Sequence, residues 1–191
     1  MRSLLLFALS LVFSAHTWAV QADALVAAAR AQVGVTLGYD PAYRQLSYPN
    51  GDVPLHTGVC TDVVIRALRQ QGLDLQQAVH EDMRAGFHLY PKNWGLSRPD
   101  RNIDHRRVPN LKTWFTRQGW ALTSAVTSDA FKPGDIVTWN LGGGLVHIGI
   151  ISDQRAVSGT PLVLHNIGRG TQEEDILFAY SITGHYRIPP T

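Results

Sequence analysis

Residues 133–151 read PGDIVTWNLGGGLVHIGII, and this stretch decides the fold. Its two apolar runs, 135–139 and 145–151, are strand-like, and the three glycines between them favour a hairpin turn. Two more strand-like runs follow at 161–167 and 185–188. The C-terminal part of the chain is therefore expected to form a mostly antiparallel sheet.

Helical patterns come earlier in the chain, at residues 23–33, 58–71 and 109–118. They carry residues typical of helix ends, such as an aspartate at the start of the first and a proline near the start of the third. The segments 38–58 and 80–107 are rich in glycine, proline, asparagine and aspartate, which predicts irregular structure. Helices followed by strands indicate an α+β domain.

The first 22 residues have the pattern of a secretion signal. A basic residue is followed by an apolar run, 4–13, and then by small residues that offer cleavage near Ala19 or Ala22. The run is about half of the ~20 residues that a membrane span requires. We therefore expect a cleaved signal and a periplasmic mature protein without stable membrane insertion. An uncleaved helix at the membrane interface is the alternative.

The mature chain, residues 23–191, has a length that suits a single domain. Loss of Arg2 with the signal lowers the formal net charge from +2 to +1, because 16 basic residues then face 15 acidic ones. This balance argues against nucleic acid as a partner and against strong attraction to a membrane surface. The sequence does not predict an oligomeric state.

Cys60 is the only cysteine, so the exported chain cannot form an internal disulfide. At helical spacing it lies near the middle of an apolar arc that also contains Val59, Val63, Val64 and Leu68. The positive end of the helix dipole favours a thiolate at this position, and the amides of the first turn could receive an oxyanion. The alternative is a small buried hydrophobic residue in the core.

His147 lies in an otherwise apolar strand, with Gly149 as a same-face neighbour that leaves space beside the imidazole ring. A buried histidine needs a partner for each ring nitrogen, and a thiol on one side with an orienting polar group on the other would provide both. His165 or Asn166 in the next strand-like run can be that group, although alternation puts the two on opposite faces. The alternatives are a core histidine and a zinc site of one cysteine and two histidines.

These residues occur in motifs that resemble the NlpC/P60 branch of the papain-like cysteine hydrolase superfamily. The motifs are Gly58-Val-Cys-Thr-Asp62, Pro133-Gly-Asp-Ile-Val137, His147-Ile-Gly-Ile150 and Leu164-His165. The resemblance implies a papain-like fold, with N-terminal helices packed on a mostly antiparallel sheet, and no cofactor. It also implies roles for four side chains: Cys60 as nucleophile, His147 as base, His165 as orienter, and Tyr48 as support for the oxyanion.

A closer resemblance is to the bacterial family called domain of unknown function 1287. It is carried by residues 58–63 (GVCTDV), 102–110 (NIDHRRVPN) and 165–168 (HNIG). The chain departs from ordinary NlpC/P60 enzymes in having Val59-Cys-Thr-Asp62 where they have D-C-S-G. It also has a long, loop-rich insertion around residues 74–108, and both departures leave the substrate open.

The insertion contains further candidates for substrate binding. Asp104 and His105 lie among arginines and could line a cleft that binds a carboxylate of a peptide. Asn166, in the strand-like run after His147, is a third candidate. The alternative for the insertion is a loop held by its own salt bridges.

The combined features predict a periplasmic cysteine hydrolase that cleaves an amide bond through a Cys-His-His thioester mechanism. The resemblance points to the stem peptides of peptidoglycan, or another peptide, as substrate. The alternative is a non-catalytic cell-wall-binding module with the same fold.

Overall fold

The computed structural model describes residues 20–123 and 127–190, so most of the predicted secretion signal lies outside the described residues. The main sheet has the strand order β6-β5-β4-β3-β7, and each neighbouring pair is antiparallel. Its strands are β3 (Ile136–Gly142), β4 (Leu145–Arg155), β5 (Pro161–His165), β6 (Gln172–Glu174) and β7 (Ser181–Tyr186). β3 and β4 form the hairpin that the triple glycine predicts.

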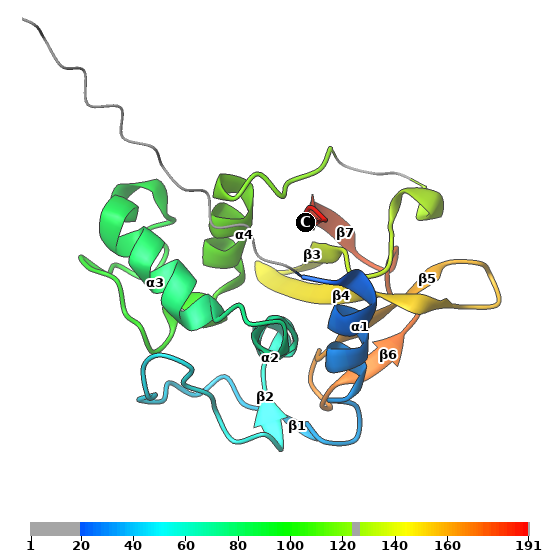
Figure 1. Ribbon diagram of the computed structural model, residues 1–191, viewed down its shortest axis with the longest axis horizontal. Coiled ribbons are helices and arrows are strands. Elements are labelled where there is room, and N and C mark those ends of the chain that lie inside the picture. The colour runs from blue at the N-terminus through cyan, green and yellow to red at the C-terminus, as the bar shows by residue number, and fades with distance from the viewer. Residues whose placement is uncertain (1–19, 124–126, 191) are drawn as a thin grey trace, which may run out of the picture.

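The helices of the described residues precede this sheet in the chain. They are α1 (Ala22–Arg30), α2 (Cys60–Gln70), α3 (Leu75–Gly86) and α4 (Val108–Arg117), with the short 3-10 turns η1 (Phe87–Leu89), η2 (Asp104–Arg106) and η3 (Ser128–Ala130). Figure 1 shows α3 at one end of the molecule and β5 and β6 at the other, with α1 and α2 between them. The predicted α+β class, with helices first and antiparallel strands afterwards, is confirmed.

A short parallel pair, β1 (Gly38–Tyr39) and β2 (Thr57–Gly58), comes directly before α2. It lies in a segment that was expected to be a loop. Strands of two residues have no readable alternation, which explains why the sequence did not predict them. None of the helices in residues 20–123 and 127–190 is long and apolar enough to cross a membrane.

The segment expected to be a loop-rich insertion contains a full helix, α3, which is a correction to the prediction. Leu75, Val79 and Met83 recur every four residues and are buried, so the helix has an apolar stripe. Asp74 caps its start by accepting a hydrogen bond from the backbone N–H of Gln76 at 3.1 Å. The many polar and charged residues between these positions obscure the period in the sequence.

The sheet separates two apolar clusters, and this separation tells which way the site residues point. Ile148 of β4 and Leu164 of β5 pack with the helices in one cluster, while other residues of β3, β4 and β5 form the second cluster on the opposite face. Successive strand residues alternate between faces, so His147 and His165 leave the sheet on the side of the second cluster. Cys60, in contrast, belongs to the cluster on the helix side.

Candidate active site

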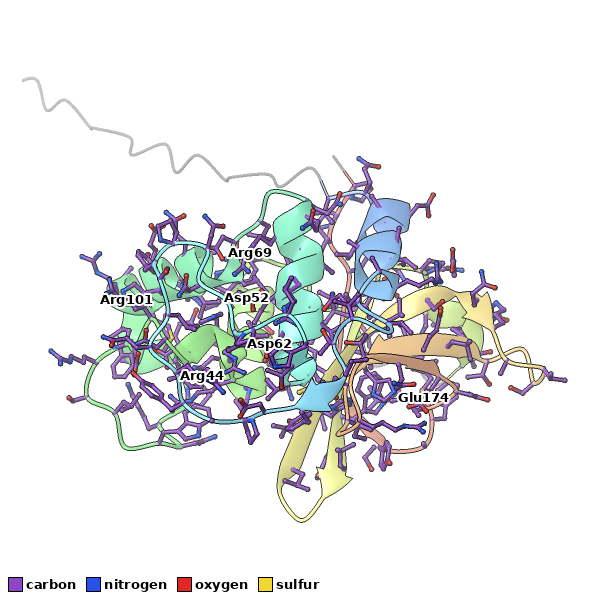
Figure 2. The ribbon with its side chains drawn as sticks, turned by 90° about the horizontal axis from the view of Figure 1, so that it is seen from below. Arg44, Asp52, Asp62, Arg69, Arg101 and Glu174 are labelled. Carbon is purple, nitrogen blue, oxygen red and sulfur yellow. The ribbon has the colours of Figure 1, made fainter. Side chains whose placement is uncertain are left out.

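Cys60 is the first residue of α2, and hydrogen bonds of Asp62 and Arg66 hold this helix in place; Figure 2 shows Asp52 and Asp62 beside α2. Val59 is extended, and its backbone N–H donates to Oδ2 of Asp62 at 2.6 Å, so the carboxylate closes the first turn. Arg66, one turn further along, is buried and donates from Nε to Asp52 at 2.9 Å. The loop before the helix and α2 itself are therefore joined around Cys60.

The sulfur of Cys60 lies in an apolar environment and is only 4% exposed. Burial raises the pKa of Cys60 to about 11, although hydrogen bonds from the backbone of Ile148 and Thr61 and from the Tyr39 side chain act in the opposite direction. The nearby charge of Asp62 raises the pKa further. The thiol is therefore protonated at neutral pH in this structure, in contrast to the thiolate that a helix start favours.

The tyrosine whose hydroxyl affects the pKa of the thiol is Tyr39 rather than Tyr48. In the parallel pair Tyr39 lies opposite Gly58, which is two residues before Cys60. Burial, followed by the charge and hydrogen bond of Cys60, raises the pKa of the Tyr39 hydroxyl, so this group remains a hydrogen-bond donor at neutral pH. Tyr48 instead packs edge-on against the ring of His80, with 5.4 Å between the ring centroids. The predicted oxyanion support is thus placed elsewhere, because spacing along the chain does not reveal a parallel pairing.

His147 and His165 are brought together by neighbouring strands. Nε2 of His147 lies 3.0 Å from Nδ1 of His165, and the two rings are nearly perpendicular. Nε2 of His165 lies 3.1 Å from Oε2 of Glu174, a residue of β6 that was not singled out in the sequence. β6 pairs with β5 so that His165 lies opposite Gln172, which brings the Glu174 side chain to the outer nitrogen.

The carboxylate of Glu174 determines which ring nitrogens carry protons. Burial lowers the pKa of His147 to about 3, with the charge of His165 adding to the effect, and burial also lowers the pKa of His165, so both rings are neutral at pH 7. Glu174 can only accept, so Nε2 of His165 carries a proton and its Nδ1 is bare. Nε2 of His147 must then donate to His165, which leaves Nδ1 of His147 as a bare acceptor. Such a nitrogen can take up a proton.

Gly149 is in close contact with β5 instead of leaving open space beside the His147 ring. A Cβ atom at this position would lie 2.7 Å from Cγ1 of Val163 and 3.1 Å from Cβ of His165. The glycine therefore allows β5 to approach, and with it the second histidine. The expectation of free space was wrong, although the requirement for a glycine is real.

Cys60 and His147 are neighbours in the fold but are not hydrogen-bonded to each other. They come from opposite sides of the sheet, and the thiol meets β4 at the backbone of Ile148, next to His147 in the chain. The hydrogen bonds found among the described residues include none between Sγ and the His147 ring; that ring bonds to His165. Transfer of the thiol proton to Nδ1 would require the Cys60 side chain to turn toward the imidazole.

Asp62, in the same helical turn as Cys60, forms a buried ion pair with Arg106. Arg106 donates from Nε to Oδ1 of Asp62 at 3.0 Å and from Nη2 to Oδ2 at 2.9 Å, with side chains 2% and 4% exposed. Its remaining donors reach the carbonyl oxygens of Asp40 at 3.3 Å and Ala42 at 3.5 Å. The insertion thereby supplies the cation that neutralises the carboxylate beside Cys60 and holds the loop that follows Tyr39. Neither residue was assigned a role from the sequence.

The three predicted substrate-binding residues are all buried, and two of them, Asp104 and Asn166, bind other parts of the protein. Asp104 accepts hydrogen bonds from the backbone of Asp100 at 2.5 Å and from Arg107 at 3.1 Å. Asn166 donates to the carbonyl oxygens of Gly38 at 3.1 Å and Gly58 at 3.2 Å, so it holds the β1–β2 pair against β5. These are structural contacts. Asp104 fits the alternative interpretation of the insertion, a loop held by its own salt bridges, because it pairs with Arg107.

His105 is the third of these residues, and it is 2% exposed with no hydrogen-bond partner for Nδ1. As for metal binding, no three His, Cys, Asp or Glu side chains in residues 20–123 and 127–190 are grouped so that they could hold an ion. The outer nitrogen of His165 lies 3.1 Å from Oε2 of Glu174.

The family of the chain agrees with part of the resemblance seen in the sequence. Residues 26–188 match the family described as "Domain of unknown function (DUF1287)". The chain belongs to this family. It is also 58% identical over 164 residues to "Uncharacterized protein YijF" of Escherichia coli (strain K12), a match that covers 86% of this chain and 80% of that protein. All residues of the candidate site lie within the range of the family match.

The burial of His105 gives a prediction for stability as a function of pH. Burial lowers the pKa of His105 to about 3, below its ordinary value of 6.5, so the folded state favours the neutral ring. The contribution of the neutral His105 ring to the free energy of unfolding is complete above pH 6.5 and is lost as the pH falls from 6.5 toward 3. Between pH 7 and pH 5 the wild type should lose about 2 kcal/mol more unfolding free energy than His105→Leu. Urea unfolding at the two pH values measures this, and equal losses in both proteins would contradict it.

The raised pKa of Cys60 gives a second prediction. Iodoacetamide should label the native thiol slowly at pH 7, and the rate should rise about tenfold per pH unit as far as pH 10. Cys60→Ala corrects for labelling of other residues, and mass spectrometry of the intact protein follows the rate. A rate that is already constant below pH 8 would show a resting thiolate instead.

Proposed function

We propose that this protein is a periplasmic cysteine hydrolase with an NlpC/P60-type, papain-like arrangement, and that it cleaves an amide bond in peptidoglycan stem peptides. The observation that carries the proposal is the series from Glu174 through His165 to His147. It leaves a bare nitrogen on His147, next in the chain to the residue whose backbone contacts the Cys60 sulfur. Nucleophilic catalysis requires a nitrogen base that the thiol can reach, and here the base lies one residue along the chain from the backbone group that acts on the sulfur.

The proposed reaction begins with a neutral thiol and a neutral imidazole. When substrate binds, the Cys60 side chain turns toward His147, Nδ1 takes the thiol proton, and the sulfur attacks the amide carbon. The oxyanion receives hydrogen bonds from Tyr39 and from the first amides of α2. His165 and Glu174 stabilise the imidazolium, which then gives its proton to the leaving amine. Water, deprotonated by His147, hydrolyses the thioester and restores the thiol.

Digestion of purified peptidoglycan sacculi tests this function. The mature wild type should release soluble muropeptide fragments, and mass spectrometry of the fragments identifies the bond that is cut. Cys60→Ala should release none, whereas His88→Ala, which changes an exposed histidine away from the site, should act like the wild type. Equal release by wild type and Cys60→Ala would remove Cys60 as the nucleophile.

A second candidate is a non-catalytic cell-wall-binding module. Two observations favour it: burial raises the pKa of Cys60, and the thiol has no hydrogen bond to His147 among the described residues. A binding module should sediment with sacculi and release nothing from them. Cys60→Ala should then bind as well as the wild type, which makes the same digestion experiment decisive between the two functions.

A further inference from the structure

The arginines of this protein divide into two groups. Nine of the thirteen that the structure describes form ion pairs with aspartate or glutamate. Four have no such pair among the described residues: Arg84, Arg98, Arg101 and Arg155. Three of these four gather in one place. Arg98 and Arg101 line the same hollow as His80, and Arg84 lies one turn after His80 on α3.

The hollow has a volume of about 490 Å³ and lies on the insertion side of the molecule. Besides His80, its walls include Tyr43, Leu96, Arg98, Asp100, Arg101 and Asn102. Figure 2 shows Arg101 on the opposite side of α2 from Glu174, so this site is separate from the histidine series. The wall therefore combines two guanidinium groups that form no ion pair among the described residues with apolar and aromatic surface; that of Arg101 lies 5.5 Å from the ring centroid of Tyr48.

Hydrogen bonds hold the walls of the hollow in position. The Tyr43 hydroxyl donates to Oδ2 of Asp100 at 3.0 Å and lies 2.9 Å from the side-chain nitrogen of Asn102. Oδ1 of Asn102 accepts from the backbone of Leu46 at 3.0 Å. Asp100 is the acidic residue of the wall, and its Oδ1 accepts from the backbone of Asn102 at 2.9 Å. Both carboxylate oxygens of Asp100 thus accept hydrogen bonds from the wall itself, which leaves the two arginines to act on a ligand.

The hollow is within reach of a ligand that also occupies the thiol site. Tyr43 follows Tyr39 by four residues, and four extended residues span at most about 14 Å. Arg106 binds the carbonyl oxygens of the intervening loop at Asp40 and Ala42 while it pairs with Asp62 behind Cys60. The positions of the hollow and of the thiol site are therefore coupled through one arginine.

We propose that this hollow binds a carboxylate of an acidic peptide. Arg98 and Arg101 would donate to the carboxylate, since guanidinium groups match its planar geometry. Tyr43 and Leu96 would contact the aliphatic part of the same residue. The proposed function supplies only the reason for a peptide to be there; binding itself needs no step at Cys60.

The test compares two dipeptides with amidated C-termini, alanyl-glutamate and alanyl-glutamine, so that only the glutamate side chain offers a carboxylate. Titration into the mature protein carrying Cys60→Ala, followed by NMR, gives the dissociation constant of each. Alanyl-glutamate should bind roughly tenfold more tightly. Arg98→Gln combined with Arg101→Gln should remove this difference. Arg155→Gln, which also changes an arginine without an ion pair but on the far hairpin, should retain it.

Equal affinity for the two dipeptides, no measurable binding of either, or an equal loss in Arg155→Gln would overturn the proposal. The double variant changes exposed side chains, and its thermal unfolding confirms that it folds. A charge preference that depends on Arg98 and Arg101, in a protein that digests no sacculi, would reject the hydrolase while keeping this site. Digestion of sacculi by a protein that shows no charge preference would support the hydrolase and reject this carboxylate site.

Discussion

His147→Gln should lower kcat/KM for a stem-peptide substrate by a factor of roughly 10² to 10⁴. Glutamine can still donate a hydrogen bond toward His165, but it cannot take up the thiol proton, so the chemical step is lost while the packing is largely kept. Nδ1 of His147 is the bare nitrogen because Glu174 imposes the tautomer of His165. Steady-state rates of product release measure the change. His88→Gln is the control, since it replaces an exposed histidine.

The two residues behind His147 should have smaller and graded effects. Glu174→Gln keeps a polar partner for His165 but removes the charge that stabilises the imidazolium, and we expect a loss of about tenfold, mainly in kcat. His165→Asn should lose more, because it interrupts the series at its centre. An unchanged kcat/KM in His147→Gln would contradict the role of this series, even if Cys60→Ala were inactive.

Arg106→Met should destabilise the folded protein by about 3–5 kcal/mol. The substitution leaves the Asp62 carboxylate buried and unpaired beside Cys60, where it is 4% exposed and has lost both hydrogen bonds from the guanidinium. Urea unfolding at pH 7 measures the change. Arg44→Met, which removes an exposed ion pair with Asp40, is the matched control and should leave the unfolding midpoint unchanged.

A double-mutant cycle separates the interaction between Asp62 and Arg106 from the other effects of the two substitutions on stability. Asp62→Asn alone should also destabilise, and Asp62→Asn combined with Arg106→Met should be less destabilised than the sum of the two single changes. Because the charge of Asp62 raises the pKa of Cys60, Asp62→Asn should in addition move the pH profile of alkylation to lower pH. Strict additivity would mean that the two side chains do not depend on each other.

Some of the site could be predicted from the sequence because it follows local periodicity. Its apolar arc predicts that Cys60 lies at the start of a helix, and alternation and order predict that His147 and His165 lie in neighbouring strands. The structure has all three at those positions. Their partners are different, because Tyr39 and Glu174 depend on strand registers that the sequence does not specify.

The direction in which the pKa of Cys60 shifts shows a second limit of prediction from the sequence. A helix start favours a thiolate, and this effect is visible in the sequence. Burial acts in the opposite direction and is larger, but it depends on how closely α2 and β4 pack around the sulfur. The ion pair of Asp62 and Arg106 joins residues 44 positions apart, so no local pattern indicates it.

Trapping of a thioester tests the central claim most directly. The wild type is mixed with a stem-peptide substrate, quenched in acid within the first turnovers, and digested for mass spectrometry. The account predicts a mass increase equal to the acyl part of the substrate on the peptide that contains Cys60, and none in Cys60→Ala. Product release without any adduct on that peptide, at the same rate in Cys60→Ala, would contradict it.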